Sequence, residues 1–198
     1  MRDVIALVFN YSLNGLLADP DTDFWDFAFE LLDEHGGPDQ DDATLELLRG
    51  ASAHVMGRVA YKGFAPNMPT STGPWAQILN AGNKVVVSTT MTSAEWANTT
   101  IASGDLTEEI ERLQQGEGGH VLVWGGVTLW RSLMRLDLID EFRISMYPYL
   151  TSTGTLLFDG VPEGYALDLV SAVPDREGVV ELRYRRPREQ ATTGEDER

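Results

Sequence analysis

The pattern of apolar residues changes about two thirds of the way along the chain, and this change limits the folds open to it. In the first part, short apolar runs such as residues 4–9 and 85–88 alternate with segments of helical period. Continuous apolar runs are typical of parallel strands buried on both faces. In the last third, apolar and polar residues alternate at 142–146 and 180–184, as in antiparallel strands with one face in water. We therefore expect an α/β fold in a single domain: a mixed, mostly parallel sheet flanked by helices, with antiparallel C-terminal strands.

The individual elements follow from the same patterns. The chain has 198 residues, enough for one domain with a full core. Apolar runs predict strands at residues 4–9, 53–56, 85–88 and 120–124, and alternation predicts strands at 142–146 and 180–184. Helical spacing predicts helices at residues 24–34, 41–49, 75–81, 106–115 and 127–135. The fourth helix opens with Asp105 as N-cap and Glu108 three residues later.

Composition and charge exclude several kinds of partner. The formal net charge is −16, and residues 19–42 contain ten acidic residues without Lys or Arg. Such a surface repels phosphate backbones, so we expect no nucleic-acid partner. No apolar run reaches the roughly 20 residues of a membrane span, so we expect a cytoplasmic protein without membrane contact. Residues 188–198 lack large apolar side chains, so we expect a folded domain at 1–187 and a disordered acidic tail.

Metal binding is not expected either. The absence of Cys excludes thiolate sites and disulfides. Asp19, Asp21, Asp23 and Glu30 match four positions of a calcium loop, but Phe24 stands where that loop needs glycine. The three histidines have no ligand spacing, and His54 and His120, beside apolar strands, are expected to be structural.

Two adjacent glycines, Gly125 and Gly126, stand between a predicted strand and a predicted helix. Bare N–H groups and the helix dipole attract an anion there, and the missing side chains let a phosphate approach. Thr128 adds a hydroxyl group. A tight turn without a ligand fits the spacing equally well, and the stretch is not the G-x-G-x-x-G fingerprint of a Rossmann fold.

Two further strand ends carry groups that bind anions. Gly57 and Arg58 follow the strand at 53–56, and a guanidinium grips phosphate through two hydrogen bonds. Ser88 and Thr89 end the strand at 85–88 with hydroxyl groups. Alternatively, Arg58 forms a surface ion pair and the hydroxyls cap the next segment. Together the three ends predict a crevice for an anionic ligand.

Four motifs in register resemble the dihydrofolate reductase superfamily, and most closely the reductase domain of bacterial riboflavin biosynthesis, the RibD C-terminal domain. They are SLNGLLA at 12–18, MGRVAY at 56–61, KVVVST at 84–89 and WGGVTLWRSLMRLDLIDEFRISMYPYL at 124–150. The resemblance covers roughly residues 3–185. It implies a mostly parallel sheet with helices on both faces and NADPH as the cofactor.

The resemblance also assigns roles to residues of this chain. Arg58 would bind the 2′-phosphate, with Gly57, Ser88 and Thr89 near the adenosine-phosphate end. The pyrophosphate would lie on Gly125, Gly126, Val127 and Thr128. Residues 7–17 would flank the nicotinamide, and the helix at 24–34 would form part of the substrate pocket.

Some positions depart from the family pattern. Asn14 replaces the aspartate of S-L-D-G, and Ala60 and Lys62 replace the threonine and glutamate of G-R-x-T-Y-E. Losing the threonine removes one phosphate contact. Asp26 lies in the region of the proton-donating carboxylate of dihydrofolate reductase, although a solvated acid among ten is the alternative. Phe24 and Trp25 are candidates to stack on a flat substrate, or else they belong to the core.

The resemblance thus implies an NADPH-dependent reductase that transfers hydride to a small pterin-like, pyrimidine-like or carbonyl substrate. The alternative is a non-catalytic module that binds a nucleotide or a pterin on the same fold. We also expect a homodimer, as in relatives that pair through late strands, with Phe142, Ile144, Met146 and Tyr147 as contact residues.

Overall fold

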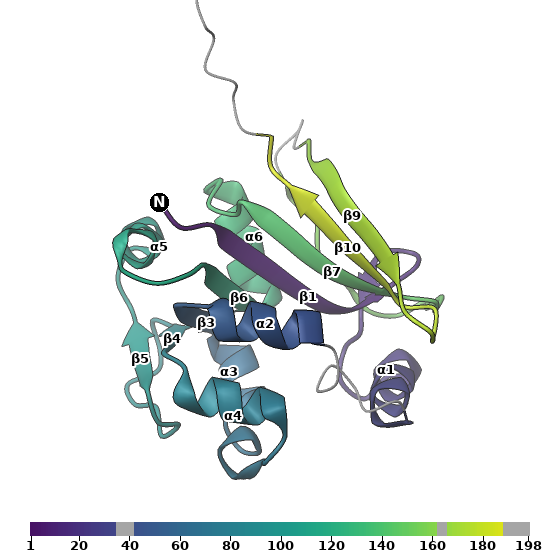
Figure 1. The fold of residues 1–198 in the computed structure, drawn as a ribbon, viewed down its shortest axis with the longest axis horizontal. Helices are drawn as coiled ribbons and strands as arrows, with labels where there is room; N and C mark the ends of the chain where they lie inside the picture. Colours follow the sequence, from purple (N-terminus) through teal and green to yellow (C-terminus); the bar gives the residue numbers. More distant parts are fainter. Residues whose placement is uncertain (35–41, 162–165, 188–198) are drawn as a thin grey trace, which may run out of the picture.

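One sheet runs through the molecule (Figure 1). The structure is a computed structural model that describes residues 1–34, 42–161 and 166–187. The strands, in spatial order, are β5 (Thr99–Ala102), β4 (Lys84–Val87), β3 (Ala53–Gly57), β6 (Val121–Gly125), β1 (Val4–Ser12), β7 (Glu141–Tyr147), β10 (Val180–Arg185) and β9 (Asp168–Pro174). Two short strands, β2 (Leu16–Leu17) and β8 (Thr155–Leu156), pair with each other, and β2 also pairs with the end of β1.

The sheet is parallel from β5 to β7 and antiparallel from β7 to β9. This confirms the predicted mixed sheet with antiparallel C-terminal strands. The alternating pattern at 142–146 indicates an antiparallel strand, but β7 is antiparallel only to β10 and runs parallel to β1. Alternation arises here because one face of β7 is polar: Phe142 and Ile144 enter the core, while Arg143 faces the other side among charged neighbours.

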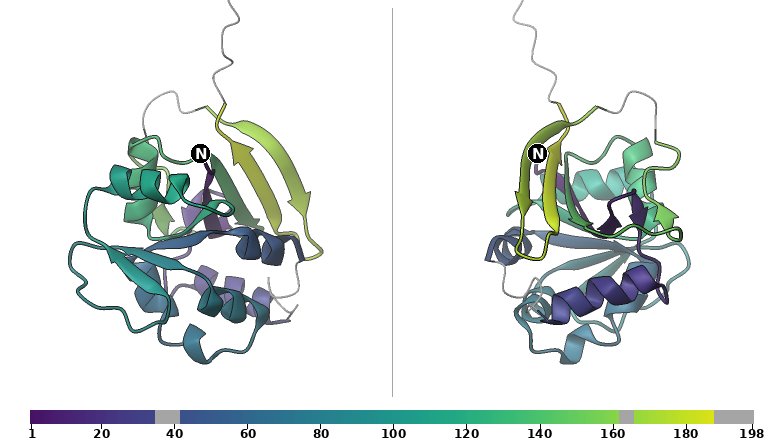
Figure 2. Two further views of the ribbon diagram at one scale, coloured as in Figure 1. Left: turned by 60° about the vertical axis from the view of Figure 1, so that its left-hand side comes forward. Right: turned by 90° about the vertical axis from the view of Figure 1, so that its right-hand side faces the viewer.

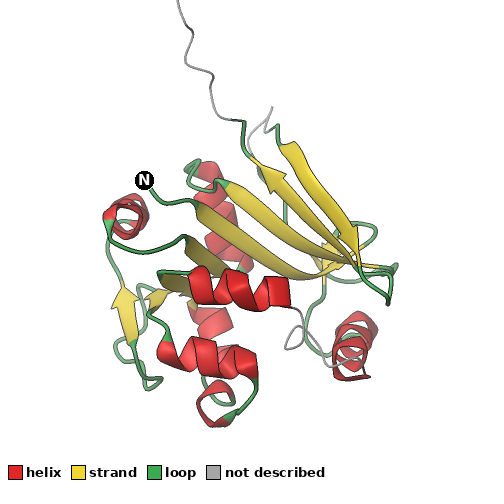
Figure 3. Ribbon diagram, in the orientation of Figure 1, coloured by secondary structure: helices red, strands yellow, loops and turns green. Residues whose placement is uncertain are grey.

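Helices cover both faces of the parallel part (Figure 3). One face packs on α5 (Leu106–Gln115) and α6 (Val127–Arg135). The other packs on α2 (Asp42–Gly50), α3 (Arg58–Phe64) and α4 (Pro74–Ala81), which follows the short helix η2 (Met68–Thr70). Helix α1 (Asp23–Glu34) packs separately, near the end of β7.

The continuous apolar run of β1 explains its place in the middle of this arrangement. Val4, Ala6 and Val8 pack toward α6, while Ile5 and Leu7 pack toward α2 and α4. All five side chains are buried. A strand with two apolar faces is stable only between two layers of helices, as the sequence predicts.

The five predicted helices are confirmed, each within one residue of its expected ends. Asp105 caps α5 as predicted, accepting hydrogen bonds from the N–H groups of Thr107 and Glu108. Strands β5 and β9 were not predicted. Strand β5 is a half-exposed Thr-Thr-Ile-Ala segment, and β9 is exposed along almost its whole length, so neither carries a buried apolar pattern.

The last two strands extend past the helices (Figure 2). The predicted dimer contacts are wrong for Phe142, Ile144 and Tyr147, because these side chains are already buried inside the chain. The exposed apolar residues of this region lie on β9 instead. No helix among residues 1–34, 42–161 and 166–187 is long and apolar enough to cross a membrane. The predicted tail at 188–198 lies outside the described residues.

Candidate functional site

The glycine pair lies where β6 ends and α6 begins. Gly125 has φ of 130° and Gly126 has φ of 94°, conformations that side chains with a Cβ rarely adopt. A Cβ on Gly125 would also lie 3.1 Å from the ring of Trp130. The backbone here therefore requires glycine, which the sequence predicts at a point of close approach.

The end of β3 meets the same glycines. Val55 pairs with Val123 but Met56 pairs with Gly125, so β6 contains one extra residue at Trp124. This bulge brings the two strand ends together: a Cβ on Gly57 would lie 3.4 Å from the carbonyl oxygen of Gly125. Backbone without side chains thus forms a cradle between β3 and β6.

Helix α6 begins inside this cradle. Gly126 is its N-cap and offers no side-chain acceptor for the first N–H groups of the helix. Val127 is half-buried and Thr128 is exposed, so the first turn is accessible to a ligand. Free N–H groups and the positive end of the helix dipole favour an anion at this point.

Arg58 is exposed and directly follows Gly57. No residue within the described ranges forms an ion pair or a hydrogen bond with its guanidinium. The alternative, a surface ion pair of Arg58, is therefore not formed with any of the described residues. The side chain is a cation available at the same edge of the sheet as the glycine cradle.

The hydroxyl of Ser88 is already engaged. Its Oγ accepts hydrogen bonds from the N–H groups of Thr90, at 3.2 Å, and of Met91, at 3.1 Å. The capping role considered as the alternative is thus present in the structure. Thr89 is exposed beside it, and its hydroxyl has no hydrogen-bond partner among the described residues. Because β4, β3 and β6 are neighbours in the sheet, the three predicted strand ends do lie side by side.

The residues predicted to meet the substrate lie on α1. Phe24 is only 1% exposed, and its ring stacks on Tyr149 at 5.0 Å and meets the edge of Tyr147. This packing leaves no open ring face, so Phe24 is a core residue and not the stacking residue that the sequence suggests. Trp25 is half-buried against Phe29, and Asp26 is exposed.

Asn14 follows the end of β1, and it is the residue that departs from the S-L-D-G pattern of the resemblance. Its side-chain amide donates to the carbonyl of Thr151 at 2.8 Å and accepts from the N–H of Thr151 at 3.2 Å. A carboxylate has no N–H to donate, so Asp at this position would lose the first of these bonds. The departure at Asn14 therefore has a structural reason in this chain.

Asn10 lies within residues 7–17, the segment expected to flank the nicotinamide, but the sequence does not single it out. This residue adopts a left-handed conformation, φ 55°, at a bulge in β1, and its buried Oδ1 has no hydrogen-bond partner among the described residues. A bulge depends on the pairing between strands that are distant in sequence, so no local pattern announces it. In the part of the chain that the structure describes, no three His, Cys, Asp or Glu side chains gather closely enough to hold a metal ion.

Comparison with known proteins places the chain among relatives of the same architecture. It is 26% identical over 153 residues to the uncharacterized protein YyaP of Bacillus subtilis, covering 74% of this chain and 80% of YyaP. A putative riboflavin biosynthesis protein from Shewanella is similar in structure, with a TM-score of 0.74 and 22% identity, over 94% of this chain and 99% of the other.

Two other solved structures show the same fold. One is a pyrimidine reductase-like protein from Corynebacterium diphtheriae, with a TM-score of 0.64 and 15% identity, over 95% and 93% of the two chains. The other is dihydrofolate reductase from Enterococcus faecalis, complexed with NADP(H), with a TM-score of 0.55 and 15% identity, over 93% and 96%. The fold is therefore that of dihydrofolate reductase. Residues 4–180 match the model of the RibD C-terminal domain, and the chain belongs to that family.

Proposed function

We propose that this protein is an NADPH-dependent reductase that transfers hydride to a small pterin-like, pyrimidine-like or carbonyl substrate. The observation that carries the proposal is the glycine cradle between β3 and β6, which leads into the uncapped start of α6. A pyrophosphate needs both close backbone approach and free N–H donors, and this edge of the sheet offers both. Family membership makes a reductase plausible, since pyrimidine reductase-like proteins share the fold.

The residues around the cradle have distinct proposed roles. Gly125, Gly126, Val127 and Thr128 hold the pyrophosphate. Arg58 binds the 2′-phosphate that distinguishes NADPH from NADH, because its guanidinium is exposed and without a partner among the described residues. Gly57 lets the cofactor approach the backbone closely. In this proposal, Ser88 and the exposed Thr89 contact the adenosine-phosphate end of the cofactor.

When bound, NADPH supplies the hydride. The chain's part is to hold the nicotinamide against a flat substrate and to exclude water. The half-buried Trp25 is the remaining candidate to contact that substrate, since Phe24 is enclosed. Asp26 is our candidate proton donor, with water as the alternative source.

Arg58→Ala tests the proposed cofactor site. We expect NADPH to bind about tenfold more weakly, a loss of about 1.4 kcal/mol, because the charged contact to the 2′-phosphate is gone. Affinity for NADH should remain close to that of the unchanged protein. Fluorescence titration with both nucleotides measures the two affinities. Equal losses for NADPH and NADH would reject the role of Arg58, and no binding of NADPH by the unchanged protein would reject the reductase.

A second candidate is a binding module without turnover, and one feature of the structure favours it. Asn14 binds Thr151 through both its amide N–H and its side-chain oxygen, at a position where the S-L-D-G pattern has a carboxylate. Turnover assays with pterin, pyrimidine, carbonyl and quinone compounds distinguish the two candidates. If NADPH binds but none of these compounds oxidises it, the module is the better description.

A further inference from the structure

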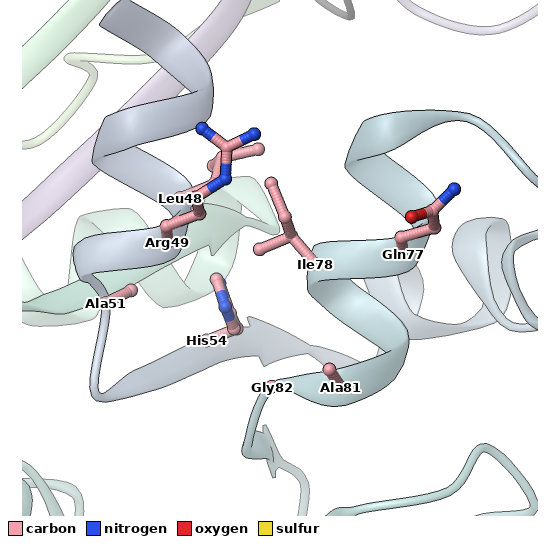
Figure 4. A pocket seen from close by; sticks show the side chains of 8 residues that line it. All are labelled: Leu48, Arg49, Ala51, His54, Gln77, Ile78, Ala81 and Gly82. Carbon is pink, nitrogen blue, oxygen red and sulfur yellow. The ribbon is translucent and has the colours of Figure 1, made fainter. Parts of the chain in front are cut away.

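A cavity of about 400 Å³ opens between α2 and α4 (Figure 4). Its apolar wall consists of Leu48 and Ala51 on one side and Ile78 and Ala81 on the other. The cavity lies at the start of β3, whereas the proposed cofactor site lies at the end of the same strand. The two sites are therefore separate.

The floor of the cavity is His54, whose ring points from β3 toward the space between the two helices (Figure 4). The side chain is 1% exposed. The indole Nε1 of Trp124 donates a hydrogen bond to its Nδ1 at 2.9 Å, so Nδ1 carries no proton. In the neutral ring the proton then resides on Nε2, and this atom is a donor.

The neutral form of His54 is the stable one. Burial lowers the pKa of His54 to about 4, and the nearby positive charge of Lys84 acts in the same direction. None of the described residues accepts a hydrogen bond from Nε2. Nε2 faces the cavity, so it is a donor that a ligand with an acceptor group can reach.

The charges around the cavity are unusual for this chain. Among the described residues, its lining contains Arg49 and no acidic side chain, although the whole chain has 31 acidic and 15 basic residues. Arg49 is exposed at the rim and has no partner among residues 1–34, 42–161 and 166–187. Lys84 lies beside the lining, with its Nζ donating to the carbonyl of Gly82 at 2.8 Å. The described lining therefore carries a positive charge in a strongly negative molecule.

We propose that this cavity binds a small carboxylic acid with an apolar body. The carboxylate accepts hydrogen bonds from His54 Nε2 and from the guanidinium of Arg49. The apolar body packs on Leu48 and Ile78. The proposal does not depend on the reductase function, because it uses none of the residues assigned to NADPH.

The hydrogen bond between His54 and Trp124 also provides a specific signal. Trp124 is the bulged residue that directly precedes Gly125. A ligand on Nε2 polarises the His54 ring and alters the hydrogen bond that Trp124 makes to the opposite nitrogen. The indole N–H resonance of Trp124 therefore reports on occupancy of the cavity.

Calorimetric titration of the full chain with benzoate tests the proposal, together with two probes that each lack one feature. Acetate has the charge without the body, and benzamide has the body without the charge. We expect benzoate to bind at least about tenfold more tightly than either probe and to shift the Trp124 resonance. Equal binding of benzoate and benzamide, or no binding of benzoate at millimolar concentration, would overturn the proposal.

Arg49→Ala and Arg58→Ala form a matched pair of exposed arginines. Arg49→Ala should weaken benzoate binding about tenfold and leave NADPH affinity unchanged. Arg58→Ala should weaken NADPH binding about tenfold and leave the affinity for benzoate unchanged. Ala81→Phe, which fills the cavity, should abolish the shift of the Trp124 resonance. Benzoate binding that is insensitive to Arg49→Ala and Ala81→Phe would place the acid elsewhere and refute the assignment.

Discussion

At the scale of single residues, the environment of His54 makes the stability of the fold depend on pH. Its pKa is about 4 in the folded chain, against 6.5 for an unperturbed histidine. Between these two values the unfolded chain binds more protons than the folded one, so protonation favours unfolding. The free energy of unfolding therefore falls as the pH is lowered from 6.5 toward 4, by roughly 3 kcal/mol over the whole range.

Urea unfolding of the unchanged protein and of His54→Gln measures this effect. Glutamine can still accept a hydrogen bond from Trp124 but does not titrate. We expect the loss of stability between about pH 7 and about pH 5 to be clearly smaller in the variant. His120 contributes equally to both proteins, because burial lowers its pKa too and it is unchanged. The same loss in both proteins would contradict the prediction.

At the scale of elements, the junction between β6 and α6 tolerates only glycine. In Gly126→Ala, a Cβ would stand on backbone with φ of 94°, which costs on the order of 1–3 kcal/mol. We expect lower stability in urea unfolding and weaker NADPH binding, because the cradle must distort. Gly63→Ala is the matched control: it lies within α3, its Cβ would meet nothing within 4 Å, and alanine should stabilise the helix by up to about 1 kcal/mol. Full NADPH affinity in Gly126→Ala would count against the cradle.

The same junction shows what could be predicted from the sequence. Gly125 and Gly126 can be recognised from the sequence alone. Glycine weakens both strands and helices, so an adjacent pair between them indicates an unusual backbone conformation or a close contact. The bulge at Trp124 does not stand out, since it arises from pairing with β3, about 70 residues earlier. The cavity at His54 likewise combines α2, β3 and α4, and no local pattern links them. Phe24 was ambiguous because a core aromatic and a stacking aromatic have the same spacing.

At the scale of the whole molecule, we propose that the homodimer expected from the sequence forms through β9. This strand is at the end of the sheet order, and Leu169 and Val173 are 57% and 58% exposed on it. An edge strand has unpaired N–H and C=O groups that can bond to the same strand of a second copy. Two identical edges can pair antiparallel about a twofold axis, which would also bury the exposed apolar residues.

Val173→Lys tests this arrangement by placing a charge on the exposed strand. Light scattering should show a dimer for the unchanged protein and a monomer for the variant, because two buried lysines would repel each other. Val59→Lys is the control. Val59 is 70% exposed on α3, and α3 follows β3, which is separated from β9 by several strands of the sheet. A monomer for the unchanged protein at micromolar concentration, or a dimer for Val173→Lys, would refute the proposed interface.

The central position of β1 has a consequence for how this protein is made. The long neighbours of β1 are β6 and β7, and both follow it by more than 100 residues in the chain. Until β7 is complete at residue 147, β1 has two apolar faces and lacks its full set of neighbouring strands. Such long-range pairing closes slowly. The apolar faces of β1 therefore stay open to wrong contacts until a late stage of folding, whatever the stability of the finished fold.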